Sequence, residues 1–210
     1  MREIWFALVA VLSLAGAVPA SAQSPSKPAA DAQKLLAPTQ QDRVLGKTDA
    51  PVTIVEYASL TCPHCAHFDK DVLPKLKEKW IDTGKAKLVF RDFPLDGSAV
   101  KGALLARCAA PDKFYGFIDV LFNSQDTWAR GGDPTPALAR VAKLGGMGDD
   151  QFQSCMKDSA LQDKVLASRL AGEKEFGVES TPTFFINGKK LIGAQSYDKF
   201  DEALKAAEKA

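Results

Sequence analysis

The stretch VTIVEYASLTCPHC, residues 52–65, decides how this sequence folds. It opens with an apolar, β-branched run at residues 52–57, which predicts a buried strand. It ends in the motif CPHC at residues 62–65, where a helical pattern begins, and Pro63 suits the first helical turn because its missing N–H has no partner to lose there. A second strand with alternating side chains is predicted at residues 86–93. Strand, helix and strand in close succession predict a parallel βαβ unit.

The rest of the chain divides into a helical block and a second β-containing part. Apolar residues at helical spacing predict five helices, at residues 98–109, 112–122, 135–144, 149–156 and 159–176. Asn187-Gly188 then separates two short apolar runs, which predicts a hairpin, and an amphipathic helix closes the chain. The order βαβ, helical block, ββα predicts an α/β fold with these parts: residues 45–97, an inserted helical domain at 98–176, and residues 177–210.

Composition and charge exclude several classes of protein. Among 210 residues, 46% are hydrophobic and 25% are charged, which excludes a disordered chain, a collagen-like repeat and a multi-span membrane protein. The formal net charge of +1 lacks the positive excess of a nucleic-acid-binding surface. We therefore expect no nucleic-acid partner.

The N-terminus has the pattern of an export signal. An apolar run at residues 4–18 is too short to span a membrane comfortably, and small residues ending at Ala22 form a cleavage site, so residues 1–22 are predicted to be a signal peptide. An uncleaved N-terminal anchor is the alternative. Residues 23–44, rich in Ala, Pro, Ser and Gln, are predicted to form a flexible linker. Export implies an oxidising compartment, where disulfides persist.

The CPHC motif carries the chemistry. Cys62 falls at or beside a helix N-cap, where the helix dipole and free backbone N–H groups favour a thiolate. His64 can add positive charge or a hydrogen bond, and Pro63 stiffens the turn. A low thiolate pKa stabilises the reduced pair and makes the Cys62–Cys65 disulfide oxidising.

The alternatives to a redox-active CxxC pair are a metal site and a purely structural disulfide. Cys62, Cys65 and His67 could hold a soft metal ion, but a structural metal site usually takes a second close pair of cysteines, and Cys108 and Cys155 stand alone. We therefore expect no metal. If the CxxC pair is redox-active, Cys108 and Cys155 are left to pair with each other, as a structural disulfide or as one that tunes the redox state.

A further motif completes a resemblance to a known family. Thr181-Pro182-Thr183 precedes a Phe-Phe-Ile strand, and together with CPHC and the order of elements it makes residues 51–209 resemble thioredoxin-fold proteins of the DsbA type. These are periplasmic thiol:disulfide oxidoreductases. The resemblance implies a thioredoxin fold (βαβ…ββα) with a helical domain inserted between its halves.

The resemblance also assigns roles within the CPHC motif. Cys62 resembles the nucleophile that forms the mixed disulfide with substrate, and Cys65 resembles the buried cysteine that resolves it. His64 matches the histidine that stabilises the thiolate, and Pro63 matches its neighbour.

Three residues outside the motif also match the family. Pro182 resembles the cis-proline that faces the active site, and Thr181 resembles the residue that contacts the substrate backbone. Glu56, six residues before Cys62, resembles a buried acid that assists proton transfer, although a solvated strand-end glutamate is the alternative.

The implied function is an oxidase that donates its disulfide to unfolded or newly exported proteins containing cysteine. The Cys62–Cys65 disulfide is its redox centre and no separate cofactor is expected, while a membrane redox partner would reoxidise the pair. A disulfide isomerase or reductase of the same fold is the main alternative. A soft-metal-binding or chaperone-like periplasmic module is the other.

Overall fold

The structure is a computed structural model that describes residues 34–35, 37, 39 and 41–209. The predicted signal peptide, residues 1–22, lies outside the described residues. Within the described part of the chain, no helix is both long and apolar enough to cross a membrane.

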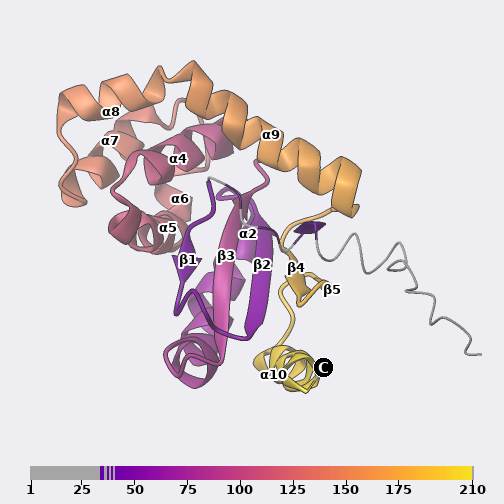
Figure 1. Cartoon of the computed structure of the whole chain (residues 1–210). Helices are drawn as coiled ribbons and strands as arrows, with labels where there is room; N and C mark the ends of the chain where they lie inside the picture. Colours follow the sequence, from indigo (N-terminus) through magenta and orange to yellow (C-terminus); the bar gives the residue numbers. More distant parts are fainter. Residues whose placement is uncertain (1–33, 36, 38, 40, 210) are drawn as a thin grey trace, which may run out of the picture.

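A central sheet organises the described residues (Figure 1). Its strands lie in the order β1-β3-β2-β4-β5, and only β2 and β3 run parallel. The strands are β1 (Val44–Leu45), β2 (Val52–Ala58), β3 (Ala86–Asp92), β4 (Thr183–Ile186) and β5 (Lys189–Ile192). The parallel βαβ unit and the Asn187-Gly188 hairpin are thus confirmed, and both turn residues have positive φ.

The helix that follows β2 is interrupted by two π-helical turns. The N–H of Leu73 bonds to the carbonyl of Phe68, which is π-helical spacing, directly before Pro74. Because Pro74 has no N–H to donate, the regular α-helical hydrogen bonds cannot continue through it. The segments are α2 (Pro63–His67), η1 (Phe68–Val72), α3 (Leu73–Leu76) and η2 (Lys77–Ile81).

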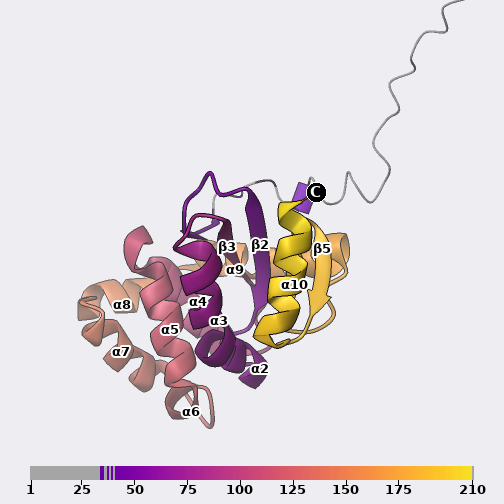
Figure 2. The ribbon, with the colours of Figure 1, turned by 90° about the horizontal axis from the view of Figure 1, so that it is seen from below.

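Helices cover both faces of the sheet (Figure 2). On one face, the α2–η2 segment and α10 (Tyr197–Glu208) pack on alternate strand residues, and the core there centres on Phe68, Phe184 and Phe200. On the other face, α9 (Ser159–Phe176) packs on residues of opposite parity, such as Tyr57. The sheet therefore has a core on each side.

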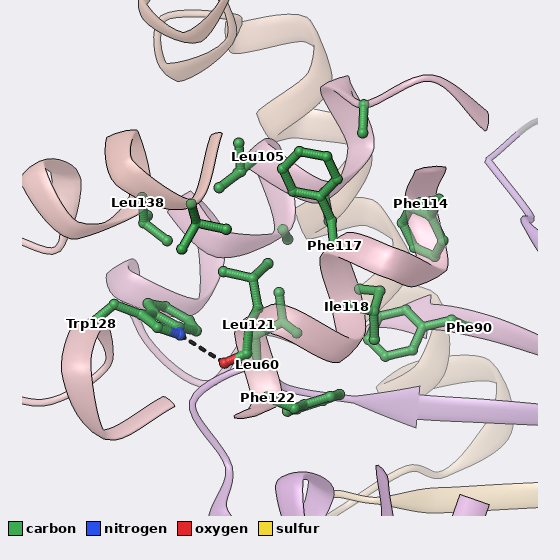
Figure 3. Packing of buried hydrophobic residues seen from close by; sticks show 14 of the residues in the cluster. Leu60, Phe90, Leu105, Phe114, Phe117, Ile118, Leu121, Phe122, Trp128 and Leu138 are labelled. Carbon is green, nitrogen blue, oxygen red and sulfur yellow. Dashed lines mark hydrogen bonds between the residues drawn. The ribbon is translucent and has the colours of Figure 1, made fainter. Parts of the chain in front are cut away.

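The helical block lies between β3 and β4 and has its own core (Figure 3). Phe114, Phe117, Leu121 and Trp128 fill it, and the indole N–H of Trp128 donates to the carbonyl of Leu121 at 2.8 Å. Besides α9, the block contains α4 (Gly97–Cys108), η3 (Pro111–Lys113), α5 (Phe114–Asn123), α6 (Gln125–Trp128), α7 (Thr135–Leu144) and α8 (Asp149–Met156).

Of the flexible linker expected at residues 23–44, residues 23–33, 36, 38 and 40 lie outside the described residues, and the described part from residue 34 onward packs on the rest of the fold. Leu35 is buried against α9 and the sheet, and the guanidinium of Arg91 donates to the carbonyl of Leu35 at 2.9 Å. Arg91 also pairs with Asp42 at 3.0 Å, and Val44 begins β1. The physical reason is that a buried arginine on β3 needs acceptors, and this segment supplies them.

Candidate active site

Cys62 lies after the end of β2, directly before the first residue of α2. It is the N-cap residue of α2, with extended backbone angles (φ −80°, ψ 121°), and Pro63 follows at the first helical position. This confirms the N-cap position expected from the sequence. Cys62 is buried, with 6% of its surface exposed.

The surroundings of Cys62 stabilise a thiolate. A hydrogen bond from the Cys65 thiol, helped by the Thr181 side chain and by the backbone N–H groups of Cys65 and His64, lowers the pKa of Cys62 to about 5. Burial opposes this effect but does not cancel it. Free N–H groups at a helix N-terminus are the expected source of such stabilisation.

Cys65 has the opposite properties. It is fully buried, and burial raises its pKa well above that of an ordinary thiol, with the hydrogen bond to Cys62 acting in the same direction. Cys62 and Cys65 are not joined by a disulfide in the structure. The pair therefore combines a sulfur that ionises readily, that of Cys62, with one that retains its proton, that of Cys65.

The loop before β4 closes the site from the other side. The Thr181-Pro182 peptide bond is cis, as the resemblance implied, and the Cys62 sulfur lies 3.3 Å from the Thr181 carbonyl oxygen. The Thr181 hydroxyl is buried and has no other hydrogen-bond partner among the described residues. It is therefore free to donate to a Cys62 thiolate.

The two histidines of α2 lie outside the buried part of the site. The side chains of both His64 and His67 are exposed, and it is the backbone N–H of His64 that lowers the pKa of Cys62. The His67 ring pairs with Asp71 at 2.6 Å. Within the described part of the chain, no three His, Cys, Asp or Glu side chains are grouped as metal ligands, so the structure does not bring Cys62, Cys65 and His67 together for that purpose.

Glu56 is buried beneath the cysteines. It lies on β2, is 3% exposed, and its Oε1 has no hydrogen-bond partner among the described residues. Burial, together with the charges of Asp69 and the Cys62 thiolate, raises the pKa of Glu56 well above its usual range. A raised pKa favours the protonated form of this carboxyl group, which lies close enough to the cysteine pair to influence its ionisation.

Asp69 is a member of this site that the sequence analysis missed. It lies in the π-helical turn after α2, is 7% exposed, and its Oδ2 has no partner among the described residues. Burial and the charge of Asp119 raise its pKa to about 7. A signal was present: Asp69 follows Cys65 by four residues, which places both on one face of a helix.

The other two cysteines lie in the helical block. Cys108 of α4 and Cys155 of α8 form a disulfide with a Cα–Cα distance of 6.1 Å. It ties together two helices that pack side by side in the block.

The sequence pattern of the thioredoxin family matches residues 38–206, which is most of the chain. The chain belongs to the thioredoxin family. Within that family it is a DsbA-type protein. The crystal structure of Wolbachia pipientis alpha-DsbA1 superimposes with a TM-score of 0.79 at 35% identity, covering 85% of this chain and 96% of that one. BdbD from Bacillus subtilis gives a TM-score of 0.74 at 27% identity, covering 81% and 95%.

Relatives known from their sequences agree with this family. Disulfide bond formation protein D of Bacillus subtilis is 31% identical over 180 residues, which is 77% of this chain and 74% of the relative. A Rickettsia bellii protein named as a protein-disulfide oxidoreductase is 33% identical over 150 residues, which is 71% of this chain and 58% of the relative. The chain thus spans about three fifths of the length of that relative and of similar Rickettsia proteins.

Proposed function

We propose that this protein is a thiol-disulfide oxidoreductase that donates its Cys62–Cys65 disulfide to other proteins. The observation that carries the proposal is the contrast within the pair: the pKa of Cys62 is lowered to about 5 and the pKa of Cys65 is raised. A thiolate that is stable at pH 7 favours the reduced pair, so the disulfide gives up its oxidising equivalents readily. A thiol pKa of about 5 in place of 7 corresponds to a reduction potential of the pair that is on the order of 60 mV more oxidising.

The exchange begins at the sulfur nearer the surface. A substrate thiolate attacks the Cys62 sulfur of the oxidised pair, the Cys62–Cys65 bond breaks, and its electrons go to Cys65. A second substrate thiolate then attacks the substrate sulfur of the mixed disulfide, and Cys62 leaves as a thiolate. Two substrate thiols become one disulfide, and the enzyme pair gains the two electrons. The low pKa of Cys62 makes it a good leaving group.

The interior sulfur needs a proton when it is released. Burial makes a Cys65 thiolate unfavourable, as its raised pKa shows. Glu56 is buried, carries a raised pKa and influences the ionisation of Cys65. We assign to Glu56 the role of supplying the proton that Cys65 takes up when the disulfide opens.

The substrates and partners of this reaction follow from the same chemistry. The substrates would be unfolded or newly exported proteins with free cysteines, since the first substrate thiol must reach Cys62 and the second must reach the mixed disulfide. Export through a signal peptide at residues 1–22 would place the protein in the periplasm. A membrane redox partner would reoxidise the pair after each turnover.

The test is the equilibrium of the pair with graded glutathione buffers, read by thiol alkylation and mass. A disulfide donor stays reduced until the buffer is strongly oxidising. A pair that stays oxidised in strongly reducing buffer would contradict the proposal and favour a reductase. Stoichiometric metal in the purified reduced protein would instead favour the soft-metal-binding module.

A further inference from the structure

One buried side chain of the helical block contacts the active-site loop, residues 60–62 between β2 and α2. Gln125 is the first residue of α6 and is 6% exposed. Its side-chain N–H₂ group donates to the carbonyl of Leu60 at 2.8 Å and to the carbonyl of Cys62 at 3.1 Å. Both hydrogens of one amide group are thus used on the two residues that bracket Thr61, at the N-terminus of α2.

These two carbonyls determine how Cys62 is held. The Cys62 carbonyl also accepts the N–H of Ala66 at 3.2 Å, so it has one helical partner and one partner from the helical block. Its direction fixes the backbone of the N-cap residue, and hence the position of the sulfur relative to the N–H groups of His64 and Cys65. Those N–H groups are among the causes of the lowered pKa of Cys62.

The amide also contributes directly to the electrostatics. Its hydrogens carry partial positive charge and are fixed at the backbone of the residue whose side chain ionises. In a buried site such a dipole is stronger than in water. The Leu60 side chain lies in the helical core with Leu121 and Trp128 (Figure 3), so the loop is attached to the block by packing as well as by hydrogen bonds.

We propose that Gln125 is a positioning residue for the Cys62 thiolate: its amide, presented by the helical block, holds the Leu60 and Cys62 carbonyls so that the N-terminus of α2 stabilises the ionised sulfur. This rests on the proposed function of the cysteine pair. It gives the helical block a part in setting the redox properties of Cys62, in addition to covering the site.

The experiment is an ultraviolet titration of the Cys62 thiolate in reduced full-length protein, for Gln125→Met and Gln125→Glu. Methionine keeps the length of the side chain and removes both donors. We expect it to raise the pKa of Cys62 and to shift the glutathione equilibrium about tenfold toward the oxidised pair, since one pKa unit is a factor of ten. Glutamate keeps the shape and replaces the donors with negative charge, so its effect should be larger.

The matched control is Trp128→Phe. Trp128 belongs to the same short helix, and its buried N–H donates to Leu121 within the block instead of to the active-site loop. This variant should have a lower thermal stability and an unchanged pKa of Cys62. If Gln125→Met does not fold, Gln125→Asn takes its place. Asparagine keeps the amide on a shorter side chain, so the pKa of Cys62 should rise, but by less than is expected for Gln125→Met.

Two failures can be told apart. An unchanged Cys62 titration in folded Gln125→Met and Gln125→Glu would overturn the role of Gln125 and leave the exchange activity intact. Equal shifts in the Gln125 variants and in Trp128→Phe would also overturn it, because general loosening of the block would then explain the result. An ordinary thiol pKa in the unsubstituted protein would overturn the proposed function itself.

Discussion

The sulfur of Cys62 lies 3.3 Å from the carbonyl oxygen of Thr181, although 119 positions separate the two residues in the chain. The antiparallel pairing of β4 with β2 creates this contact, because it places the start of β4 beside the end of β2. The active site is therefore assembled from both halves of the fold, and the helical block inserted between them does not interrupt it.

Thr181→Val tests the hydroxyl on this side of the site. Valine has the same shape without the hydroxyl, so the Cys62 thiolate loses a donor that has no competing partner among the described residues. Hydrogen bonds to charged groups contribute about 1.5–3 kcal/mol. We expect the pKa of Cys62 to rise and the glutathione equilibrium to shift about tenfold toward the oxidised pair. An unaltered titration would show that the backbone N–H groups and Cys65 suffice.

Single serine variants test the division of labour between the two sulfurs. Cys62→Ser should abolish thiol exchange, because the buried Cys65 cannot be attacked. Cys65→Ser should accumulate mixed disulfides with substrate proteins on Cys62, since no internal thiol remains to resolve them. Non-reducing gels and mass measurement detect these adducts. Adducts on Cys62→Ser instead would reverse the two roles.

The pH dependence of stability should differ between the oxidised and reduced proteins. The pKa of Cys62 is about 5 in the folded state and about 8.5 in an unfolded chain, so the unfolded reduced chain binds a proton that the native state lacks between those values. Across that window the reduced form should gain stability with pH, relative to the oxidised form, by up to about 1.4 kcal/mol per pH unit. The gain is lost as the pH falls through 5.

Urea unfolding of both forms from pH 4.5 to pH 8 measures this difference directly. Glu56 is present in both forms, and only the part of its raised pKa that the Cys62 thiolate causes differs between them. The raised pKa of Cys65 acts above the pKa of an unfolded thiol, outside the window. A difference that does not change with pH would mean that the thiolate is not stabilised in the native state.

The Cys108–Cys155 disulfide is expected to be structural. Closing a loop over a sequence separation of 47 gives roughly 4 kcal/mol as an upper estimate from chain entropy. The double variant Cys108→Ala/Cys155→Ala should lose stability on this scale in urea unfolding and leave the Cys62 titration unchanged. A shifted Cys62 titration would show instead that this disulfide tunes the redox pair.

Local patterns predicted the framework of the fold. The β-branched run of β2, the Asn187-Gly188 turn and the N-cap position of Cys62 each depend on neighbouring residues in the chain, and local chemistry is visible in a sequence. The strand β1 was not predicted, because two residues carry no period. It pairs with β3 in a segment that Arg91 anchors through contacts over a long sequence distance.

The parts of the site that the sequence analysis missed depend on distant packing. Gln125 is one glutamine in a helix of four residues, and nothing near it in the sequence shows that its amide meets residues more than sixty positions earlier. Asp69 is buried in a π-helical turn although Lys70 and Asp71, which follow it, are exposed, and its spacing of four residues from Cys65 is the one local sign of this. Helical turns of this kind often occur at functional sites.

Asp69→Asn tests whether this inward carboxyl is stabilised as the acid. The pKa of Asp69 is about 7 in the folded protein and about 3.9 in an unfolded chain, so the native state binds the extra proton. That contribution to stability is fully present below pH 3.9 and is lost as the pH rises through 7. Asparagine does not titrate, so the free energy of unfolding of the variant should increase relative to that of the natural protein as the pH rises from 4 to 8. The upper bound of this increase is about 4 kcal/mol.

The matched control is Asp71→Asn, two residues along the same helical segment, where the side chain is 60% exposed and pairs with His67. It should leave the pH profile of unfolding close to that of the natural protein. Removing the Asp69 charge should also lower the pKa of Glu56, because that charge is one cause of its increase. Exchange by Asp69→Asn should therefore slow at a lower pH than exchange by the natural protein, as Glu56 loses the proton that Cys65 needs. An equal increase in stability with pH in both aspartate variants would mean that the effect comes from net charge and not from burial of Asp69.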